Sequence, residues 1–419
     1  MLTKLLRQTA IPKEYHSNFL HLYFDIGWYG VLSGSAISFL TIYAARIGAT
    51  GFQIGVLGAI TGAVNLFLAI PAGRWLETQH TGRAVFWTAV LCRVGYFGFI
   101  FLPQLPNEQA EIIAILLITF LMAIPYTPVG VGFNALFAEA VPSEYRAHVA
   151  GMRNIMLSIT FMLTSLLSGY ILNKVTFPTG YQIVFAIGTL GAAMSTLHLY
   201  FVKPLQADSL EPHVLPPPRM DPGKKASSPR NIFASLRMDI WKTPFRSVLF
   251  ALFAFHFTQY LPIPLFPIYN VRVLHLNDDN IGIGTALFYL TVLIGSTQIR
   301  KLAQKYGNKN LTGWSVGGLA LYPLLLAISR TAPHFYIISL MGGLVFAFVS
   351  GSYANYMLEC IPAHDRPSHL AWYTIILNAA ILIGSLGGPV VADVIGLANA
   401  LIVFGVLRLF AAVYILKRG

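Results

Sequence analysis

One acidic residue stands inside a long apolar segment near the start of the chain, and it has the clearest potential for chemistry. This residue is Asp25, in the run YFDIGWY. A carboxylate among apolar residues is costly to keep charged, so burial favours its neutral form and makes proton exchange easier. Arg93 lies at a similar depth in another apolar segment and could instead hold the carboxylate in an ion pair. The sequence thus supports two roles for Asp25: handling a proton or cation, and a structural pair with Arg93.

A later apolar segment carries a second group of polar residues, His256, Gln259 and Tyr260. His256 is one helical turn before the other two, so all three lie partly on one helix face. Histidine titrates most readily near neutral pH, although a buried histidine also serves as a hydrogen-bonded packing residue. Aromatic and amide side chains in other segments complete a candidate ligand site: Trp28, Tyr29, Tyr126, Asn134, Tyr353 and Asn355. Such a lining suits a neutral or amphipathic organic molecule, and it suits plain helix packing equally well.

Other kinds of chemistry have little support in the sequence. The phosphate-binding pattern GxxxxGK[ST] and the zinc pattern HExxH are both absent. Cys92 and Cys360 are far apart, so they indicate neither a disulfide framework nor a metal site. We therefore expect no enzyme activity, no cofactor and no metal ion.

The composition identifies the solvent in which these residues must fold. Hydrophobic residues make up 56% of the 419 residues and charged residues only 11%, whereas soluble proteins carry roughly 25% charged residues. A disordered chain would be poor in apolar residues and rich in charge. The chain is therefore expected to be an integral membrane protein in contact with lipid, and the expected location is a plasma membrane of the bacterial inner-membrane type.

Apolar segments long enough to cross a bilayer recur along the whole chain, since a spanning helix needs about 20 mainly apolar residues. Their length and continuous apolarity favour helices over barrel strands, and the sequence predicts an all-α membrane protein of about twelve helices. The expected spans are 18–45, 51–72, 84–104, 110–138, 150–173, 180–201, 246–273, 279–301, 311–330, 334–358, 369–395 and 398–416.

Basic residues predict how these spans are oriented. The net charge is +12, and most of the 28 Lys and Arg residues fall in the N-terminus, in alternate loops and in the C-terminus. Loops rich in Lys and Arg stay on the cytoplasmic side of a membrane. Both termini and the long middle loop are therefore expected in the cytoplasm. This placement explains the positive charge without nucleic-acid binding, which we do not expect.

The middle loop divides the chain into two halves, 1–202 and 246–419, joined by a linker at 203–245. The linker is rich in proline, including Pro216-Pro217-Pro218, as is typical of an extended connection. Its second part carries apolar residues at helical spacing: Ile232, Phe233, Leu236, Ile240 and Trp241. These residues predict either a helix lying on the membrane surface or a helix that covers the cytoplasmic end of the bundle.

Short motifs repeat between the two halves in the same order. The motif Ile42-Tyr43-x-x-Arg46 returns as Ile268-Tyr269-x-x-Arg272, and Ile54-Gly55 returns as Ile281-Gly282. The stretch Glu139-Ala-Val-Pro142-x-x-x-Arg146 returns as Glu359-Cys-Ile-Pro362-x-x-x-Arg366. The two copies of each motif are separated by nearly the same number of residues, and the three motifs keep their order. This pattern indicates a six-helix unit duplicated in parallel.

With these features the sequence resembles the major facilitator superfamily over its whole length. The family carries a loop G-x-L-A-D-R-x-G-R-[RK] after spans 2 and 8. A degenerate second copy reads LAQKYGNK from Leu302, and the first reads GRWLE from Gly73, followed by Gly82-Arg83. Gln304 stands where the family has Asp, which puts an acid-dependent contact in the second half in doubt, whereas Glu77 can keep that role in the first.

The resemblance implies a gate at the cytoplasmic end of the two halves. Its candidate residues are Gly73, Arg74, Glu77, Arg83, Glu139, Arg146, Lys305, Gly307, Glu359 and Arg366. Ion pairs among them would hold the cytoplasmic side closed. The alternative is that these charges face water and lipid headgroups.

The resemblance also implies a function. Spans 1, 4, 7 and 10 would line a central cavity, and the chain would be a monomeric secondary transporter of a small organic molecule by alternating access, coupled to protons, with efflux favoured. The alternatives are an uptake permease of the same fold and a receptor or assembly factor that transports nothing. The run GSLGGP at 384–389 is similar to a motif of drug antiporters but lies in span 11, and close helix packing explains it equally well. Arg408 has no evident partner in the sequence.

Overall fold

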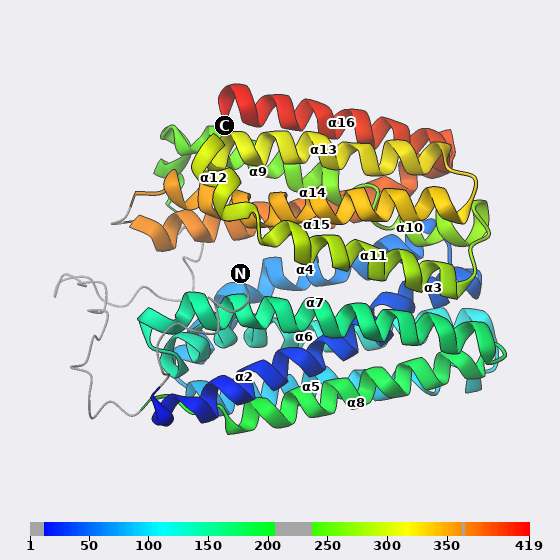
Figure 1. The fold of residues 1–419 in the computed structure, drawn as a ribbon, viewed down its shortest axis with the longest axis horizontal. Helices are drawn as coiled ribbons and strands as arrows, with labels where there is room; N and C mark the ends of the chain where they lie inside the picture. The colour runs from blue at the N-terminus through cyan, green and yellow to red at the C-terminus, as the bar shows by residue number, and fades with distance from the viewer. Residues whose placement is uncertain (1–11, 206–236, 363–364) are drawn as a thin grey trace.

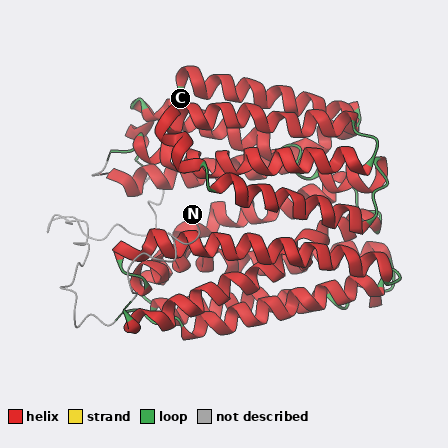
Figure 2. Cartoon of the chain, viewed as in Figure 1, coloured by secondary structure: helices red, strands yellow, loops and turns green. Residues whose placement is uncertain are grey.

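The structure is a computed structural model that describes residues 12–205, 237–362 and 365–419. Within these ranges the regular secondary structure is helical, without any strand, and short loops join the helices (Figures 1 and 2). The long helices run side by side in two bundles, and the first half of the chain forms one bundle and the second half the other (Figure 1). This arrangement confirms the predicted all-α membrane fold of two helical halves.

The first half contains six spans. The first is continuous through three segments, and its middle turn is a π-helix; the others are single helices. Their bounds are α2 Lys13–Leu32, η1 Ser33–Ile37 and α3 Ser38–Arg46, then α4 Gly51–Glu77, α5 Thr81–Phe99, α6 Glu108–Ala140, α7 Ser143–Lys174 and α8 Thr179–Phe201. A short 3-10 turn, η2 Leu102–Gln104, lies between α5 and α6.

The second half repeats this plan. Its elements are η6 Met238–Lys242, α9 Phe245–Tyr260, α10 Leu265–Ile268, η7 Tyr269–Val273, α11 Asp278–Ser296, α12 Ile299–Tyr306, α13 Asn308–Ile328, α14 Ala332–Glu359, α15 Arg366–Ile395 and α16 Leu397–Arg418. Within the described ranges, 11 helical stretches are long and apolar enough to cross a membrane. The remaining span is α5, which carries Arg83 and Arg93.

Two predicted spans differ from the observed helices. The span expected at 279–301 ends at Ser296, and a separate amphipathic helix, α12, follows it with no buried residue. Gly307 joins α12 to α13 with a φ of 77°, a conformation that glycine adopts without strain. The span expected at 246–273 is broken after Tyr260, because Pro262 and Pro264 lack the amide hydrogens that would continue the helix.

The bundle has two ends that differ in their contacts. We call the end at which α8 finishes, α9 begins and the C-terminus lies the linker end, and the opposite end, where α3 and α7 finish, the far end (Figure 1). The two halves meet along α4 with α15 and along α7 with α11. Near the far end a core cluster mixes buried residues of both halves, among them Tyr43 and Tyr269.

Glycines permit the halves to approach closely. A Cβ on Gly55 would lie 2.3 Å from the carbonyl oxygen of Ser385 in α15, and one on Gly282 would lie 2.7 Å from that of Ser165 in α7. Within the second half, a Cβ on Gly388 would overlap the carbonyl of Leu261. The glycines repeated in the sequence, and those of the run at 384–389, thus serve close helix packing.

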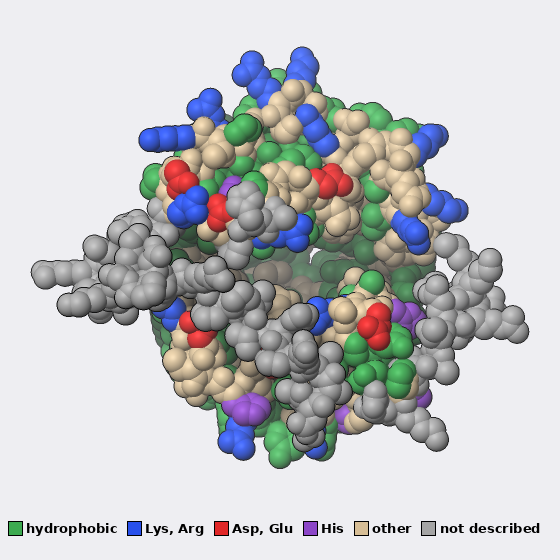
Figure 3. All heavy atoms as spheres, turned by 90° about the vertical axis from the view of Figure 1, so that its left-hand side faces the viewer, with side chains coloured by type: hydrophobic (Ala, Val, Ile, Leu, Met, Phe, Trp, Pro, Cys, Tyr) green, Lys and Arg blue, Asp and Glu red, His purple; other side chains and the backbone are tan. Residues whose placement is uncertain are grey.

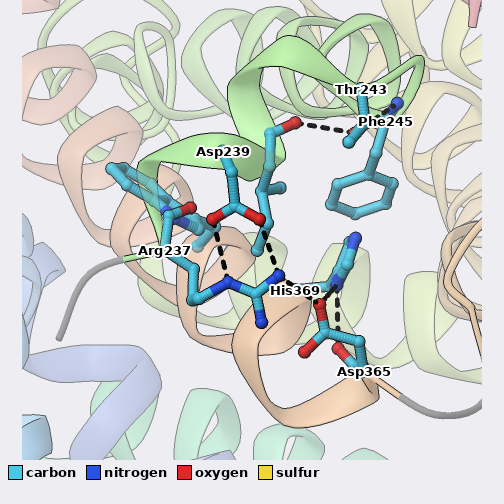
Figure 4. Close-up of polar contacts among 8 residues, drawn as sticks. Arg237, Asp239, Thr243, Phe245, Asp365 and His369 are labelled. Atoms are coloured by element: carbon cyan, nitrogen blue, oxygen red, sulfur yellow. Dashed lines mark hydrogen bonds and ion pairs between the residues drawn. The ribbon is translucent and has the colours of Figure 1, made fainter.

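The described end of the linker, from Arg237 on, contacts the second half (Figure 4). Arg237 pairs with Asp239 at 2.6 Å and with Asp365 at 3.4 Å, and the ring of His369 lies near Asp365. Ile240 is buried against α9. Most of the predicted surface helix, including Ile232, Phe233 and Leu236, lies outside the described residues. Its described end is the short turn η6, which covers the linker end of the second half.

Candidate functional site

Asp25 is buried in the first half, where three side chains hold its carboxylate. It has only 3% exposure. Arg153 Nη1 lies 3.1 Å from Oδ2, and the Ser195 hydroxyl donates to Oδ1 at 2.6 Å. Arg93 Nη2 is more distant, 3.9 Å from Oδ1. These partners come from α7, α8 and α5, so the carboxylate joins three helices to α2.

The closest cationic partner, Arg153, was not anticipated. The sequence places it near the edge of the span expected at 150–173, where an arginine would reach headgroups. The helix actually begins at Ser143, which puts Arg153 nearly three turns into it. Its side chain is buried, and Nη1 also donates to the carbonyl of Leu22 at 2.6 Å. A helical pattern that begins at Ser143 rather than at residue 150 is the sequence signal that would have indicated the buried position of Arg153.

A cavity of about 250 Å³ lies beside this cluster. Both arginines and Asp25 line it together with aromatic residues of α2, α5 and α6. The Arg153 guanidinium lies 4.7 Å from the Phe133 ring centre, and that of Arg93 lies 5.9 Å from the Tyr29 ring centre. The structure therefore brings together two predicted ligand residues, Tyr29 and Tyr126, with Asp25. Trp28 and Asn134 do not line the cavity, and the side-chain amide of Asn134 donates to the carbonyl of Gly130 within α6.

In the second half, His256 is part of an aromatic group. It is buried, its Nε2 lies 3.2 Å from the hydroxyl of Tyr373, and its ring meets Tyr353 edge to face. Gln259 and Tyr260 lie at the end of α9, where the helix breaks. Asn355 is exposed and bonds back to the carbonyl of Gly351. His256 and Tyr353 thus lie together, as a shared site requires, while Asn355 points elsewhere.

Arg408 has partners that the sequence did not suggest. Nη2 donates to the carbonyl of Thr258 at 2.8 Å, and Nη1 donates to that of Leu319 at 3.2 Å. In an α-helix a carbonyl bonds the amide four residues later, and those positions are Pro262 and Pro323. Proline has no amide hydrogen to give. Arg408 therefore supplies donors to two carbonyls, one in α9 and one in α13, that Pro262 and Pro323 leave without their usual helical partner.

At the far end, the repeated Ile-Tyr-x-x-Arg motifs reach across the two halves. Arg46 pairs with Asp278 of α11 at 2.7 Å and donates to the carbonyl of Leu276. Arg272 donates to the carbonyls of Ala45 and Ala49, at 3.0 and 2.7 Å. Each copy of the motif therefore binds the opposite half, and together they join the two halves at the far end.

At the linker end, the predicted gate residues contact their own halves. Arg146 donates to the carbonyls of Ala138 and Val141 at the end of α6, and Glu139 accepts from Thr81. Glu359 accepts from Asn308. Pro142 denies Ala138 its usual helical donor, so Arg146 caps the helix.

The remaining gate candidates are exposed or half-buried at the linker end: Gly73, Arg74, Glu77, Arg83, Lys305, Gly307 and Arg366. Between the described residues of the two halves, no hydrogen bond or ion pair is found there. The linker end is rimmed with Lys and Arg side chains and hollowed between the halves (Figure 3). The cytoplasmic gate stays a prediction for a state closed at this end.

A GxSxG sequence occurs at Gly313 to Gly317, but it does not form a hydrolase site. Ser315 is buried in the middle of α13. A hydrolase nucleophile sits on a sharp turn from strand to helix, and no such turn surrounds this serine.

Comparison with curated proteins finds transporters. The chain is 28% identical over 183 residues to the staphyloferrin B transporter of Staphylococcus aureus, which is 43% of this chain and 44% of that protein. It is 21% identical over 265 residues to the cis,cis-muconate transport protein of Acinetobacter baylyi, or 63% of this chain and 60% of that protein. Each aligned segment covers less than two thirds of the relative.

Comparison with solved structures extends over nearly the whole chain. A bacterial homologue of the iron transporter ferroportin in an inward-facing state matches with a TM-score of 0.70 at 16% identity, covering 98% of this chain and 99% of that one. The nucleoside transporter NupG matches with a TM-score of 0.68 at 15% identity, covering 96% and 99%. At these identities the likeness is one of fold.

The family follows from the sequence match, which is independent of the fold. A family model described as the Major Facilitator Superfamily matches residues 26–278 and again residues 248–418. The first match extends beyond α8 to the start of α11, and the second match runs from α9 to the last residues of α16. The chain belongs to the Major Facilitator Superfamily.

Proposed function

We propose that the protein is a secondary transporter that carries a small organic molecule across a membrane by alternating access. The observation that carries this proposal is the difference between the two ends of the bundle. Arg46, Asp278 and Arg272 join the halves at the far end, and the described linker end is without such bonds. A fold of two halves that is closed at one end and hollowed at the other is one state of an alternating-access cycle.

The distribution of Lys and Arg supports an orientation with the linker end and both termini in the cytoplasm. In that orientation the state described here opens inward. The membrane is proposed to be a bacterial inner membrane, and the transporter is proposed to act as a monomer surrounded by lipid.

The coupling ion is proposed to be the proton, with Asp25 and His256 as the titrating candidates. Within the described structure the Asp25 carboxylate is bound by Arg153 and Ser195. His256 has no acidic neighbour in the described contacts. A proton-carrying role for Asp25 would require its contact with Arg153 to break during the cycle.

Transport can be separated from a receptor role by locking the far end. Asn173 and Asp279 face each other there, with 3.3 Å between their polar atoms. A variant with Asn173→Cys and Asp279→Cys, in a background without Cys92 and Cys360, should lose flux in proteoliposomes when oxidised and regain it on reduction. A thermal-shift screen of small organic molecules across pH selects the compound whose flux is measured.

The matched control carries Asn173→Cys alone, which oxidation should leave active. Equal flux by the oxidised and reduced double variant, with the disulfide confirmed by mass, would contradict alternating access. Ligand binding with no flux in any condition would support the receptor or assembly-factor alternative. The direction of the measured flux against an imposed proton gradient distinguishes efflux from uptake.

A further inference from the structure

The charges around the cavity of the first half do not balance. Its wall contains two guanidinium groups, Arg93 and Arg153, and one carboxylate, Asp25. The other polar contacts of these groups are neutral: the hydroxyls of Ser195 and Thr196 and the carbonyl of Leu22. With all three groups ionised, the cavity keeps one positive charge without a counterion.

The two arginines are not equivalent. Arg153 lies 3.1 Å from the Asp25 carboxylate and is buried, so these two form the neutral pair. Arg93 lies 3.9 Å away, and its Nη1 is bound only to the hydroxyl of Thr196 at 2.9 Å. Arg93 is therefore the guanidinium whose charge is least compensated, and it lines the cavity.

An unbalanced charge at this depth is costly to maintain, and intramembrane charges mark binding sites for ions or substrates. Guanidinium groups bind carboxylates through paired hydrogen bonds that are strong and directional. The rest of the wall combines aromatic residues, including Tyr29, Tyr96 and Tyr126, with aliphatic ones, and it suits the apolar body of a small ligand. We propose that this cavity binds an organic anion, with its carboxylate on Arg93 and its apolar part against the tyrosines.

This inference names the substrate class of the proposed transporter and therefore rests on the proposed function. It changes the expectation from the sequence, in which aromatic and amide residues favoured a neutral or amphipathic molecule. It also changes the effect expected from removing the carboxylate of Asp25. In an anion site this carboxylate competes with the ligand for the arginines, so its removal should strengthen binding. In a site for a cation or proton, the same change would abolish binding.

The test is binding to the purified full chain in nanodiscs, measured by thermal shift and titration at fixed pH. The probes are benzoate, cinnamate and cis,cis-muconate, each compared with its uncharged amide. At least one carboxylate should stabilise the protein while its amide does not. Arg93→Gln should weaken carboxylate binding by about tenfold or more, and Arg93→Lys by less. Arg93→Gln leaves the Asp25–Arg153 pair intact and should still fold.

The matched control is Arg300→Gln, which removes one exposed positive charge from α12 at the linker end and should leave binding unchanged. Asp25→Asn should bind the carboxylate more tightly than the wild type; if its yield is low, added carboxylate should raise the yield. The inference is overturned if no carboxylate is preferred over its amide, or if Arg93→Gln and Arg300→Gln behave alike. Flux tests the other proposal separately: a carboxylate that binds through Arg93 and does not cross the membrane would refute transport and leave the anion site standing.

Discussion

Arg408 donates a hydrogen bond of 2.8 Å to the main-chain oxygen of Thr258, four residues before Pro262. The second bond of the same guanidinium reaches Leu319, four residues before Pro323. A buried arginine with no acidic partner in the described contacts is costly, and here its donors replace two that proline removes. Span 7 can thus be broken beside the candidate residues Gln259 and Tyr260 without leaving the carbonyl of Thr258 unpaired.

This relationship predicts an energetic coupling between Arg408 and Pro323. Arg408→Met leaves two buried carbonyls without donors and should lower the free energy of unfolding by about 2 kcal/mol. Pro323→Ala restores an amide hydrogen for Leu319, so the same change in that background should cost about 1 kcal/mol less. Thermal unfolding of the four combinations measures the coupling. Pro389→Ala, in a helix that Arg408 does not cap, is the control, and equal losses in all backgrounds would refute the role.

The pair of Arg46 and Asp278 should bias the far end toward closure. Arg46→Gln removes a partly buried ion pair, in which the side chains of Arg46 and Asp278 are 25% and 11% exposed. The fraction of molecules that are open at the far end should therefore rise by up to about tenfold. Spin labels at Lys174 and Asn399, which lie at the far end of opposite halves, should report a larger share of long distances. Arg330→Gln removes a charge at the same end outside this pair and should leave the distances unchanged. Identical distance distributions in Arg46→Gln and the wild type would show that this ion pair does not hold the far end closed.

Asp25 should prove more important for folding than a lone proton carrier would be. Asp25→Asn strands Arg153 in a buried position and should cost about 3 kcal/mol of stability, seen as lower folded yield and melting temperature. Adding Arg153→Gln should recover most of the loss, and adding Arg93→Gln less, because Arg153 is the nearer partner. Full stability of Asp25→Asn, combined with loss of proton-driven accumulation, would instead identify Asp25 as the carrier.

The orientation can be checked with single cysteines at Ser227 in the linker and Asn107 in a far-end loop. A membrane-impermeant maleimide applied to intact cells should label Asn107→Cys and not Ser227→Cys. Labelling of Ser227→Cys alone would reverse the proposed orientation.

The native thiol of Cys360 should react slowly with maleimides at neutral pH. Burial raises the pKa of the Cys360 thiol, with the charge of Glu359 adding to the effect and that of Lys309 opposing it. A raised pKa leaves less thiolate at neutral pH, and the thiolate is the reactive form. The labelling rate of Cys360 in detergent should therefore keep rising at a pH where an ordinary exposed thiol has already reached its plateau. A rate profile like that of free cysteine would contradict this.

The sequence by itself determined the helical membrane fold, the number and approximate position of the spans, and the family. Lipid requires every backbone amide to be satisfied within its own helix, so long apolar runs leave only helices as an outcome. The repeated motifs of Arg46 and Arg272 revealed the duplication. Asp25 and Arg93 were recognised because a charge inside an apolar run is visible without any coordinates.

Only the tertiary structure decided which groups meet. Arg153 was not among the candidate residues, and the helix that begins at Ser143 places it beside Asp25. Arg46 and Arg272 bind the opposite half, and Arg408 bonds carbonyls of helices distant in sequence. Hydrogen bonds and ion pairs act over a few ångströms, whereas spacing along one chain defines positions only within its own helix. The charge balance of the cavity therefore became apparent once the two arginines were seen around one carboxylate.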